Sequence, residues 1–536
     1  MKKKNSEIIA AIDIGLHSLK MKIARIKNDH SIKTIEDLRY PIPLGIDTFT
    51  KGNISYDSVR EVCRILKGYH LKLKEYDVEH YRIIGTNAIR EAKNRDFIIN
   101  HIKMITGFDI EILDISMARF LTYKAVRGNL EHFTRIRKEG AFLVGVSAGS
   151  SEVSVYKADH LQCSLSIRIG SLRIREMLSD LQKKTIEFYK ILEEYVESIL
   201  EAFHLSQRLD KVNHFIAIGG EIANISRVCN FNQPKRLNKI KRNDFINLYK
   251  ELVSRSTDYF SLPVENDKHF LNTPEIDLVK KYRIPQDMID LFLPSVIIYK
   301  KFLELSQAKC IELPLISFRD GILQDIMERK FPSSGDNYYT KDIIDSVRYL
   351  AERYSCDTKH YEDVTRKVLK LFDSLKKLHC LKRRERLLLE IASILHDCGN
   401  YISLTDHYKN SYQIVMSSSL IGITSRELHI IANVAYYHSH VEPSEHDRNF
   451  HQLEYGERLI VSKLVSLLKI ANALDKSHLQ KINDLEIKSI DHYIDCYIKS
   501  DKNPYLEEWA FHSRAGYFQK VFGIPVQFKL KRNKRP

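Results

Sequence analysis

Two strand–loop–strand segments with small residues in the loop constrain the fold of this 536-residue chain more than any other feature. The first is Ile8–Ile26, which turns at Gly15–Ser18 directly after Asp13. The second is Ala141–Tyr156, which turns at Ser147–Ser151. Short apolar runs bounded by turn residues are typical of buried strands. The repetition predicts a duplicated unit, with two lobes facing each other across a cleft.

Strand and helix patterns alternate through the first half of the chain. Apolar strand patterns at Arg82–Ile84 and Glu111–Leu113 enclose a helical stretch at Asn87–Ile105. Further strands are predicted at Phe215–Ile218 and Ile311–Ile316. Such alternation is typical of α/β folds. We therefore expect an α/β fold in two lobes, over residues 1–130 and 131–330.

From about residue 337 onward, long amphipathic stretches replace the strand patterns. We expect an all-helical domain over residues 336–482, followed by a small α+β domain at 483–536. The last segment, Lys529–Pro536, is basic, and we expect it to be frayed.

Composition excludes some classes of protein and leaves others open. The net charge of +15 favours anionic partners, which include polyphosphate, nucleotides, nucleic acid and anionic lipid. We find no nucleic-acid motif with interleaved aromatic residues and no apolar run long enough to span a bilayer. The eight cysteines contain no CxxC pair, which argues against a zinc knuckle or a disulfide framework and favours a cytoplasmic protein.

Four motifs in the first 330 residues resemble one known family. Ala10–Ser18 (AAIDIGLHS) resembles the first phosphate loop of the actin-like phosphotransferases, and within them that of the exopolyphosphatase and guanosine pentaphosphate phosphohydrolase (Ppx/GppA) family. Gly85–Asp96, Ile169–Arg173 and Ser317–Leu323 resemble three further motifs of this family, in the same order. The resemblance implies a two-lobed actin-like (ribonuclease-H-like) fold in which Arg90 meets phosphate.

The same resemblance implies the residues of a phosphate site. A glycine-containing turn lets backbone N–H groups approach phosphate oxygens, while a carboxylate positions a metal ion or a water molecule. The residues implied as catalytic are Glu152 and Asp13. Those implied as phosphate-binding are Gly15, Ser18, Arg90, Gly149, Ser150 and Ser151.

Two departures from the family pattern predict a degenerate catalytic site. Gly145 stands where the family has a metal-facing aspartate, and Ser116 and Met117 stand where it has two glutamates. One of those glutamates is implied as the base that activates water. A positioned general base contributes about 10²–10⁴ in rate, so hydrolysis should be slow unless Glu152, Asp13 or Asp114 substitutes.

The helical half carries a second set of candidate residues. His360 lies on the apolar face of one predicted helix, the pair His396–Asp397 ends another, and Asp475 shares a face with apolar residues of a third. This set resembles the metal ligands of HD-type phosphohydrolase domains and implies a divalent metal, magnesium or manganese. His407 and His438 fall where a second metal would draw ligands. A further family histidine is replaced by Asn410, which leaves the number of metals open.

The resemblance implies a phosphohydrolase that removes the terminal phosphate of polyphosphate or guanosine pentaphosphate. Two alternatives remain at this point. In the first alternative, the protein is a non-catalytic regulator that binds polyphosphate or an alarmone nucleotide. In the second, it is an enzyme whose HD metal site acts on a phosphoester or a nucleotide. The expected partner is polyphosphate or a guanosine polyphosphate, with no membrane and no specific nucleic acid, and a homodimer is an open alternative.

Overall fold

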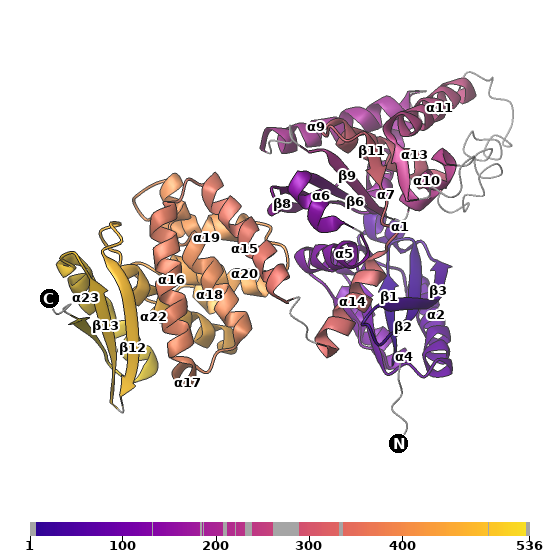
Figure 1. The fold of residues 1–536 in the computed structure, drawn as a ribbon. Helices are drawn as coiled ribbons and strands as arrows, with labels where there is room; N and C mark the ends of the chain where they lie inside the picture. Colours follow the sequence, from indigo (N-terminus) through magenta and orange to yellow (C-terminus); the bar gives the residue numbers. More distant parts are fainter. Residues whose placement is uncertain are drawn as a thin grey trace. The chain divides into compact units, whose positions relative to one another are not determined.

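The computed structural model describes residues 7–130, 132–182, 185, 187–206, 212–219, 221–230, 238–260, 289–331, 336–490 and 492–531. The chain forms two compact units, Met1–Asp336 and Asn337–Pro536, here called unit 1 and unit 2 (Figure 1). Within the described residues, no helix combines the length and the apolar composition needed to cross a bilayer.

The first sheet of unit 1 has five strands in the order β3-β2-β1-β4-β5. Strands β1 (Glu7–Ile14), β2 (Ser18–Ile26) and β3 (Ile32–Pro41) are antiparallel. Strands β4 (His80–Gly85) and β5 (Glu111–Ile112) continue the sheet in parallel with β1. The faces of this sheet that point toward the core bury aliphatic side chains. This follows from the sequence of its strands, which either alternate apolar and polar residues or are apolar along their whole length.

Helices of this lobe depart from the sequence-based prediction at two places. The predicted helix Asn87–Ile105 is two helices, α3 (Asn87–Glu91) and α4 (Arg95–Thr106), because the backbone becomes extended at Ala92. The predicted loop at Ser317–Gly321 begins α14 (Phe318–Lys330) instead, since Ser317 and Asp320 form a capping box. The other helical elements are α1 (Leu44–Ile46), the π-helical turn Asp47–Lys51, α2 (Tyr56–Glu75) and α5 (Ile115–Asn129).

The second sheet of unit 1 has six strands in the order β10-β11-β9-β6-β7-β8. They are β6 (Ala141–Val146), β7 (Ser151–Lys157), β8 (His160–Ile167), β9 (His214–Gly219), β10 (Lys239–Lys241) and β11 (Cys310–Glu312). Strands β8-β7-β6-β9-β11 repeat the directions of β3-β2-β1-β4-β5. The two hairpins also turn alike, since the Gly15 N–H donates to the Ser18 carbonyl at 3.1 Å and the Ser147 N–H to the Ser150 carbonyl at 2.9 Å.

Five helices bury a continuous apolar core against the second sheet: α7 (Ser171–Met177), α9 (Phe188–Ser206), α10 (Ile222–Cys229), α11 (Arg242–Phe260) and α13 (Ile289–Glu304). The same lobe also contains α6 (Phe133–Glu139) and α8 (Ser179–Gln182).

Unit 2 is a bundle of helices followed by a small sheet. Helices α16, α18, α20 and α22 pack against one another around its core. The elements of the bundle are α15 (Asp336–Arg353), α16 (Thr358–Ser374), α17 (Lys376–His379), α18 (Arg383–Leu395), the 3₁₀ turn Cys398–Tyr401, α19 (His407–Ser417), α20 (Ser425–Tyr436), α21 (Arg448–His451) and α22 (Tyr455–Ala473).

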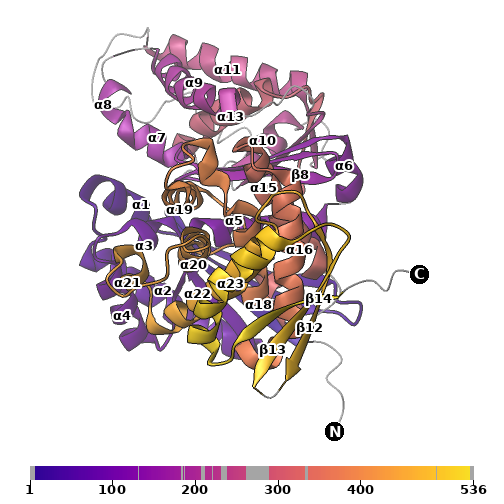
Figure 2. The same cartoon turned by 90° about the vertical axis from the view of Figure 1, so that its left-hand side faces the viewer.

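The sheet of unit 2 contains β12 (Ile482–Ile490), β13 (Tyr493–Ser500) and β14 (Val526–Lys531). Helix α23 (Tyr505–Phe522) packs on β14 and on α22 (Figure 2). The predicted frayed tail is wrong for its first residues, because β14 pairs in parallel with β13 and Lys529 donates to the buried carboxylate of Asp495 at 2.7 Å. Residues 532–536 of that tail lie outside the described residues.

Candidate functional site

Unit 1 contains a cleft of about 690 Å³ to which both hairpin loops contribute. Six of the eight residues predicted for the phosphate site line it: Asp13, Gly15, Ser18, Arg90, Ser150 and Glu152. The structure thus brings together residues that are separated by up to about 140 positions in the sequence. This convergence follows from the repeated topology, since equivalent loops leave equivalent strands of the two sheets.

The two remaining predicted residues, Gly149 and Ser151, support the second loop instead of lining the cleft. The Ser151 hydroxyl is buried and donates to the Ile169 carbonyl at 2.5 Å. The Gly149 carbonyl accepts a hydrogen bond from Arg173 Nε at 2.8 Å. A Cβ at Gly149 would lie 2.4 Å from the side-chain nitrogen of Asn87, so a larger residue would collide there.

Arg90 projects from α3 at the edge of the cleft. Its guanidinium donates to the Leu113 carbonyl at 3.2 Å and to the side chain of Asn87. Burial lowers its pKa, while Glu91, Glu152 and Asp114 act in the opposite direction. An arginine stays protonated at neutral pH even so, and it supplies a fixed positive charge to the cleft.

Glu152 is a partly buried carboxylate that lines the cleft. One of its oxygens, Oε1, accepts hydrogen bonds from Ser150 and Ser166, both at 3.0 Å. The other, Oε2, lies 3.7 Å from Arg119 Nε and has no hydrogen-bond partner among the described residues. Burial raises the pKa of Glu152 despite the opposing charge of Arg119. A carboxylate with a raised pKa and an oxygen without a hydrogen bond is suited to accept a proton.

Asp13, the next-to-last residue of β1, lines the same cleft. Burial raises its pKa, although Lys20 and Arg319 act to lower it. The Thr86 hydroxyl lies 3.4 Å from its Oδ1. Asp13 is thus a second carboxylate that could accept a proton or help to hold a cation.

Helix α5 brings no carboxylate to the cleft within the described residues. The α5 residues that line it are Ile115, Ala118 and Thr122. Met117 packs against an apolar core cluster, and Ser116 does not line the cleft. The described carboxylates that do line it are Asp13, Asp37, Glu152 and Glu221.

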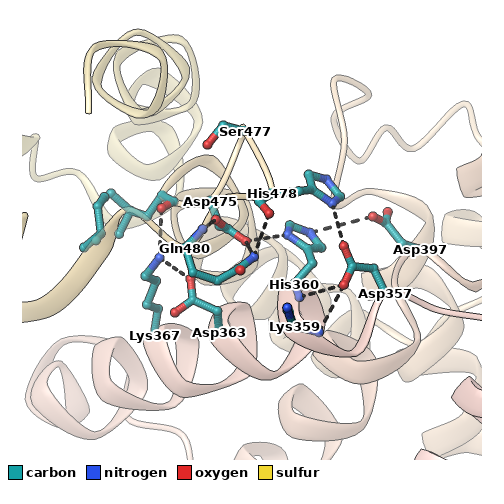
Figure 3. A network of polar contacts seen from close by, with 12 residues as sticks. Asp357, Lys359, His360, Asp363, Lys367, Asp397, Asp475, Ser477, His478 and Gln480 are labelled. Atoms are coloured by element: carbon teal, nitrogen blue, oxygen red, sulfur yellow. Dashed lines mark hydrogen bonds and ion pairs between the residues drawn. The ribbon is translucent and has the colours of Figure 1, made fainter. Parts of the chain in front are cut away.

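In unit 2, imidazole and carboxylate groups form a compact cluster (Figure 3). His360 lies in the first turn of α16, and His396 and Asp397 directly follow α18. The Nε2 atoms of His360 and His396 lie 3.3 Å apart. Asp397 Oδ2 lies 3.7 Å from the first of them and 3.6 Å from the second.

A second triangle shares the same carboxylate. His407 begins α19 and His438 follows α20, and their Nε2 atoms lie 3.2 Å apart. Asp397 Oδ1 lies 3.5 Å from His407 Nε2 and 3.1 Å from His438 Nε2. Metal–ligand distances of about 2.1 Å place tetrahedral ligands roughly 3.4 Å apart. Each triangle therefore has the dimensions of three ligands around one metal ion, and Asp397 belongs to both triangles through its two oxygens.

The other ring nitrogens show why these groups fit a metal. The Nδ1 atom of His396 lies 2.8 Å from the Ser393 carbonyl, and that of His438 lies 2.6 Å from the Ala435 carbonyl. The Nδ1 atom of His407 lies 3.4 Å from the Leu404 carbonyl, and that of His360 lies 2.8 Å from Asp475 Oδ2. An Nδ1 that donates to such an acceptor leaves Nε2 with a lone pair. Lone pairs that meet at 3.2–3.3 Å repel each other unless a cation or a proton lies between them. This arrangement of oriented imidazoles is typical of metal centres.

Charges in the cluster match this interpretation. Burial would raise the pKa of Asp397, but His396, His438 and His360 lower it well below its ordinary value. Burial lowers the pKa of His396 to about 3. The centre therefore presents an ionised carboxylate together with a neutral imidazole at His396, the protonation states that bind metals.

Asp475, predicted as a ligand, lies behind the centre in this structure. It follows the end of α22, and its Oδ2 accepts hydrogen bonds from His360 Nδ1 at 2.8 Å and from Gln480 Nε2 at 3.0 Å. Its Oδ1 accepts the Gln480 backbone N–H at 2.8 Å. The carboxylate thereby orients His360.

His478 was not singled out as a candidate ligand by the sequence, and it contacts the centre from the loop after α22. Its ring stacks on that of His360, with centroids 3.7 Å apart and planes inclined by 9°. A metal ion lies in the plane of each imidazole that binds it, and two stacked parallel planes have no common point. His478 therefore covers one face of His360 and cannot bind the same ion in this geometry. Its backbone is left-handed, with φ of 57°, a conformation that is uncommon for residues other than glycine.

Two α/β lobes with matched phosphate-loop hairpins around one cleft define an actin-like fold. Comparison with known proteins agrees. A model of the Ppx/GppA phosphatase family matches residues 22–330, and a model of domain III of Ppx/GppA phosphatases matches residues 344–513. The chain belongs to the Ppx/GppA phosphatase family.

Three similar proteins illustrate the relationship. A guanosine-5'-triphosphate,3'-diphosphate pyrophosphatase of Photobacterium profundum is 19% identical over 436 residues, 80% of each chain. A bifunctional 3-dehydroquinate synthase/phosphatase of Fusobacterium nucleatum is 26% identical over 181 residues, which are 33% of this chain and 27% of the relative. The crystal structure of an exopolyphosphatase from Cytophaga hutchinsonii superposes with a TM-score of 0.50 and 18% identity, over 60% of this chain and 98% of that one. The chain thus spans about a quarter of one curated relative and four fifths of the other.

Proposed function

We propose that the cleft of unit 1 hydrolyses the terminal phosphoanhydride bond of inorganic polyphosphate or guanosine pentaphosphate. The observation that carries this proposal is Glu152, a partly buried carboxylate with a raised pKa in the same cleft as Arg90 and the two hairpin loops. The relatives named as exopolyphosphatase and as guanosine-5'-triphosphate,3'-diphosphate pyrophosphatase support this class of substrate.

The proposed reaction is an in-line attack of water on the terminal phosphorus. As the oxygen of the water bonds to phosphorus, Glu152 accepts a proton from that water. The bond from phosphorus to the bridging oxygen breaks, and the shortened chain leaves as an anion. Arg90 and the backbone N–H groups of the Gly15–Ser18 and Ser147–Ser151 loops stabilise the negative charge that develops. A divalent ion, magnesium or manganese, would neutralise further phosphate charge, and Asp13 would help to hold it.

We propose that this reaction is slow. Glutamates are missing at Ser116 and Met117, and Gly145 offers no carboxylate beside Glu152. The same absences favour the alternative of a regulator that binds polyphosphate or an alarmone nucleotide without cleaving it. The two possibilities differ in turnover and share the binding site.

The cleft is tested with two variants and two assays. Glu152→Gln should lower phosphate release from polyphosphate by about 10²–10⁴-fold with little change in binding, because the amide cannot accept a proton at neutral pH. Arg90→Ala should weaken binding of the same substrate by about tenfold or more, because a charge-assisted contact is lost. Unchanged release in Glu152→Gln would exclude it as the base. Unchanged binding in Arg90→Ala, with an intact circular dichroism spectrum, would exclude the cleft as the site.

A second candidate function is hydrolysis of a phosphoester or nucleotide at the centre in unit 2. The pair of triangles around Asp397 favours it. We propose that one divalent cation binds His360, His396 and Asp397, and that a second binds His407, His438 and Asp397. In this proposal Asp475 orients His360 and is not itself a ligand. A bound metal would supply an activated water and positive charge for a phosphate.

Metal titration tests this arrangement. His396→Ala should abolish binding at the first position, because it removes a nitrogen that points directly into the triangle. Asp475→Asn should weaken binding by only about 10–100-fold, the effect typical of a group that orients a ligand. Elemental analysis after dialysis against manganese gives the stoichiometry. Equal and complete loss in both variants would make Asp475 a ligand, and no metal in the unmodified protein would leave a hydrogen-bonded network.

Polyphosphate or a guanosine polyphosphate is the proposed partner, in keeping with the net charge of +15, and a homodimer is the proposed oligomer. A cytoplasmic location is supported by the eight cysteines, none of which forms a disulfide in the structure.

A further inference from the structure

Helix α7 holds the loop of the β6–β7 hairpin by its backbone carbonyl groups. The Ser171 N–H donates to the Ser147 carbonyl at 3.1 Å. The Arg173 N–H donates to the Ala148 carbonyl at 3.0 Å. Arg173 also donates through its side chain, from Nε to the Gly149 carbonyl at 2.8 Å. Three successive carbonyl groups of the β6–β7 loop are therefore turned toward α7.

The direction of these carbonyl groups fixes the direction of the N–H groups in the same loop. The C=O and N–H of a trans peptide lie on opposite sides of its plane, so the N–H groups of Ala148 and Gly149 face away from α7. Among the residues that the structure describes, none accepts a hydrogen bond from either group. Ala148 itself lines the cleft. The loop thus offers backbone donors to an anion, and their direction depends on what holds the carbonyls.

The Gly149 carbonyl depends on a side chain, whereas the two before it are held by the backbone of α7. Its peptide also contains the Ser150 N–H, which donates to the Ser147 hydroxyl at 3.2 Å. Glycine adopts a wide range of backbone conformations, so this peptide can rotate once its carbonyl is released. A carbonyl oxygen turned into the cleft would repel the oxygens of a phosphate group.

The guanidinium of Arg173 also joins the β6–β7 loop to helix α3. Its Nη2 donates to both carboxylate oxygens of Glu91, at 2.8 and 2.6 Å. Glu91 is the last residue of α3, and Arg90 precedes it. The guanidinium carbon lies 4.6 Å from the ring centroid of Phe49, a cation–π distance. The Arg173 side chain is only 14% exposed, so solvent screens this ion pair less than one on the surface.

We propose that Arg173 is a positioning residue for phosphate binding in the cleft of unit 1. It keeps the carbonyl groups of the β6–β7 loop turned away from the ligand, and it fixes that loop to α3 beside Arg90. The inference rests on the cleft proposed above as the phosphate site, and Arg173 itself does not line that cleft. One side chain thereby sets the spacing between the Arg90 guanidinium and the backbone donors of the loop. Groups that are fixed before the ligand arrives lose little freedom when it binds.

Calorimetric titration of inorganic tripolyphosphate into the full-length protein tests this role. Arg173→Met should weaken binding about tenfold, because the loop and α3 lose their common contact. Arg173→Lys should weaken it less, since it keeps a charge for Glu91. Arg175→Met is the matched control for the lost charge, because Arg175 lies on the same helix and does not line the cleft. It should leave the affinity within about twofold of that of the unmodified protein.

Glu91→Ala separates positioning from long-range electrostatics. Removing a negative charge near an anion site should strengthen binding if charge alone matters. Loss of the contact with Arg173 should instead weaken binding, by about threefold or more. The double variant Arg173→Met/Glu91→Ala should bind no more weakly than Arg173→Met alone, because both changes break the same contact. If Arg173→Met fails to fold by circular dichroism, Glu91→Ala and Arg173→Lys decide the question.

Arg90→Ala, measured in parallel, separates failure of this role from failure of the cleft. Weaker binding in Arg90→Ala, Arg173→Met and Glu91→Ala, with Arg175→Met unchanged, supports the proposal. Tighter binding in Glu91→Ala, equal weakening in Arg173→Met and Arg175→Met, or weaker binding in Arg90→Ala alone overturns the role of Arg173 and leaves the cleft as the phosphate site. Unchanged binding in Arg90→Ala overturns the cleft as the site, and the role of Arg173 with it.

Discussion

Gly145 lines the cleft at the position where the resemblance to the family implies a metal-facing aspartate. It pairs with Glu152 across the β6–β7 hairpin, and a Cβ placed on it would lie 3.6 Å from the Cβ of Glu152, an ordinary contact. Its φ is not in the left-handed region. Nothing in the backbone or packing therefore requires glycine there.

Gly145→Asp should accordingly fold and should raise magnesium-dependent phosphate release from polyphosphate. The new carboxylate would lie beside Glu152 and give a divalent ion a second ligand with Asp13. We expect a gain of tenfold or more over the unmodified protein, about 1.4 kcal/mol in the barrier. Gly68→Asp, at an exposed position on α2 with open space around it, is the matched control. An unchanged rate in Gly145→Asp at saturating magnesium would show that the absent carboxylate does not limit turnover.

The sequence could predict which residues come together where a motif fixes both residue and position. Asp13, Arg90 and Glu152 do line one cleft, and His360, His396 and Asp397 do meet. The sequence could not distinguish a residue that lines a candidate site from one that lies behind it. Gly149 and Ser151 hold their loop, and Asp475 turns toward His360 Nδ1, because hydrogen-bond direction depends on neighbours distant in the chain.

At the scale of elements, strands with a continuous apolar pattern were the easiest to predict. Strand β3 (Ile32–Pro41) was missed, because one side of it is exposed and its sequence is rich in charge. Strand β14 was missed for a related reason, since the lysines of its segment resemble a solvated tail until they meet Asp495 and Glu486. In both cases the partner strand supplies stability that a local pattern does not contain.

The packing of α22 against α23 buries a lysine, and this makes unit 2 sensitive to pH. Lys469 Nζ donates to the carbonyls of Ser439 and Val441, and the side chain is 2% exposed. Burial, and then the charge of Arg514, lower its pKa from 10.5 to about 7, while Glu442 acts in the opposite direction. The unfolded chain therefore binds more protons than the folded chain between about pH 7 and 10.5.

The free energy of unfolding of unit 2 should rise with pH across that window. Urea unfolding at about pH 7 and about pH 9 should differ by up to about 3 kcal/mol in the contribution of Lys469. Lys469→Met should remove this difference, whatever its effect on stability at a single pH. An equal pH dependence in the variant would show that Lys469 stays protonated in the folded state.

The whole molecule divides into two compact units with different candidate chemistry. We expect the two units to unfold in separate thermal transitions. A metal bound only to folded unit 2 stabilises that unit by RT ln(1 + [L]/Kd), about 2.7 kcal/mol at a hundredfold excess over Kd. Scanning calorimetry of the full chain with manganese should therefore show one transition that moves to lower temperature when chelator is added. The other transition should stay in place.

The His396→Ala variant provides the control for this calorimetric experiment, since its scan should not respond to chelator. If both transitions of the unmodified protein move together, the stabilising ion is not confined to unit 2. If neither moves, manganese does not bind the folded centre at the concentrations used.

The contact between Glu507 and the backbone of Ser477 has an optical consequence. The only tryptophan of the chain, Trp509, lies two residues further along α23 and is 64% exposed. Helix α23 thus joins the single strong fluorophore of the protein to the loop that borders the centre. Emission from Trp509 gives a label-free signal for events in that loop, in a chain whose tyrosines are too numerous to report on any one place.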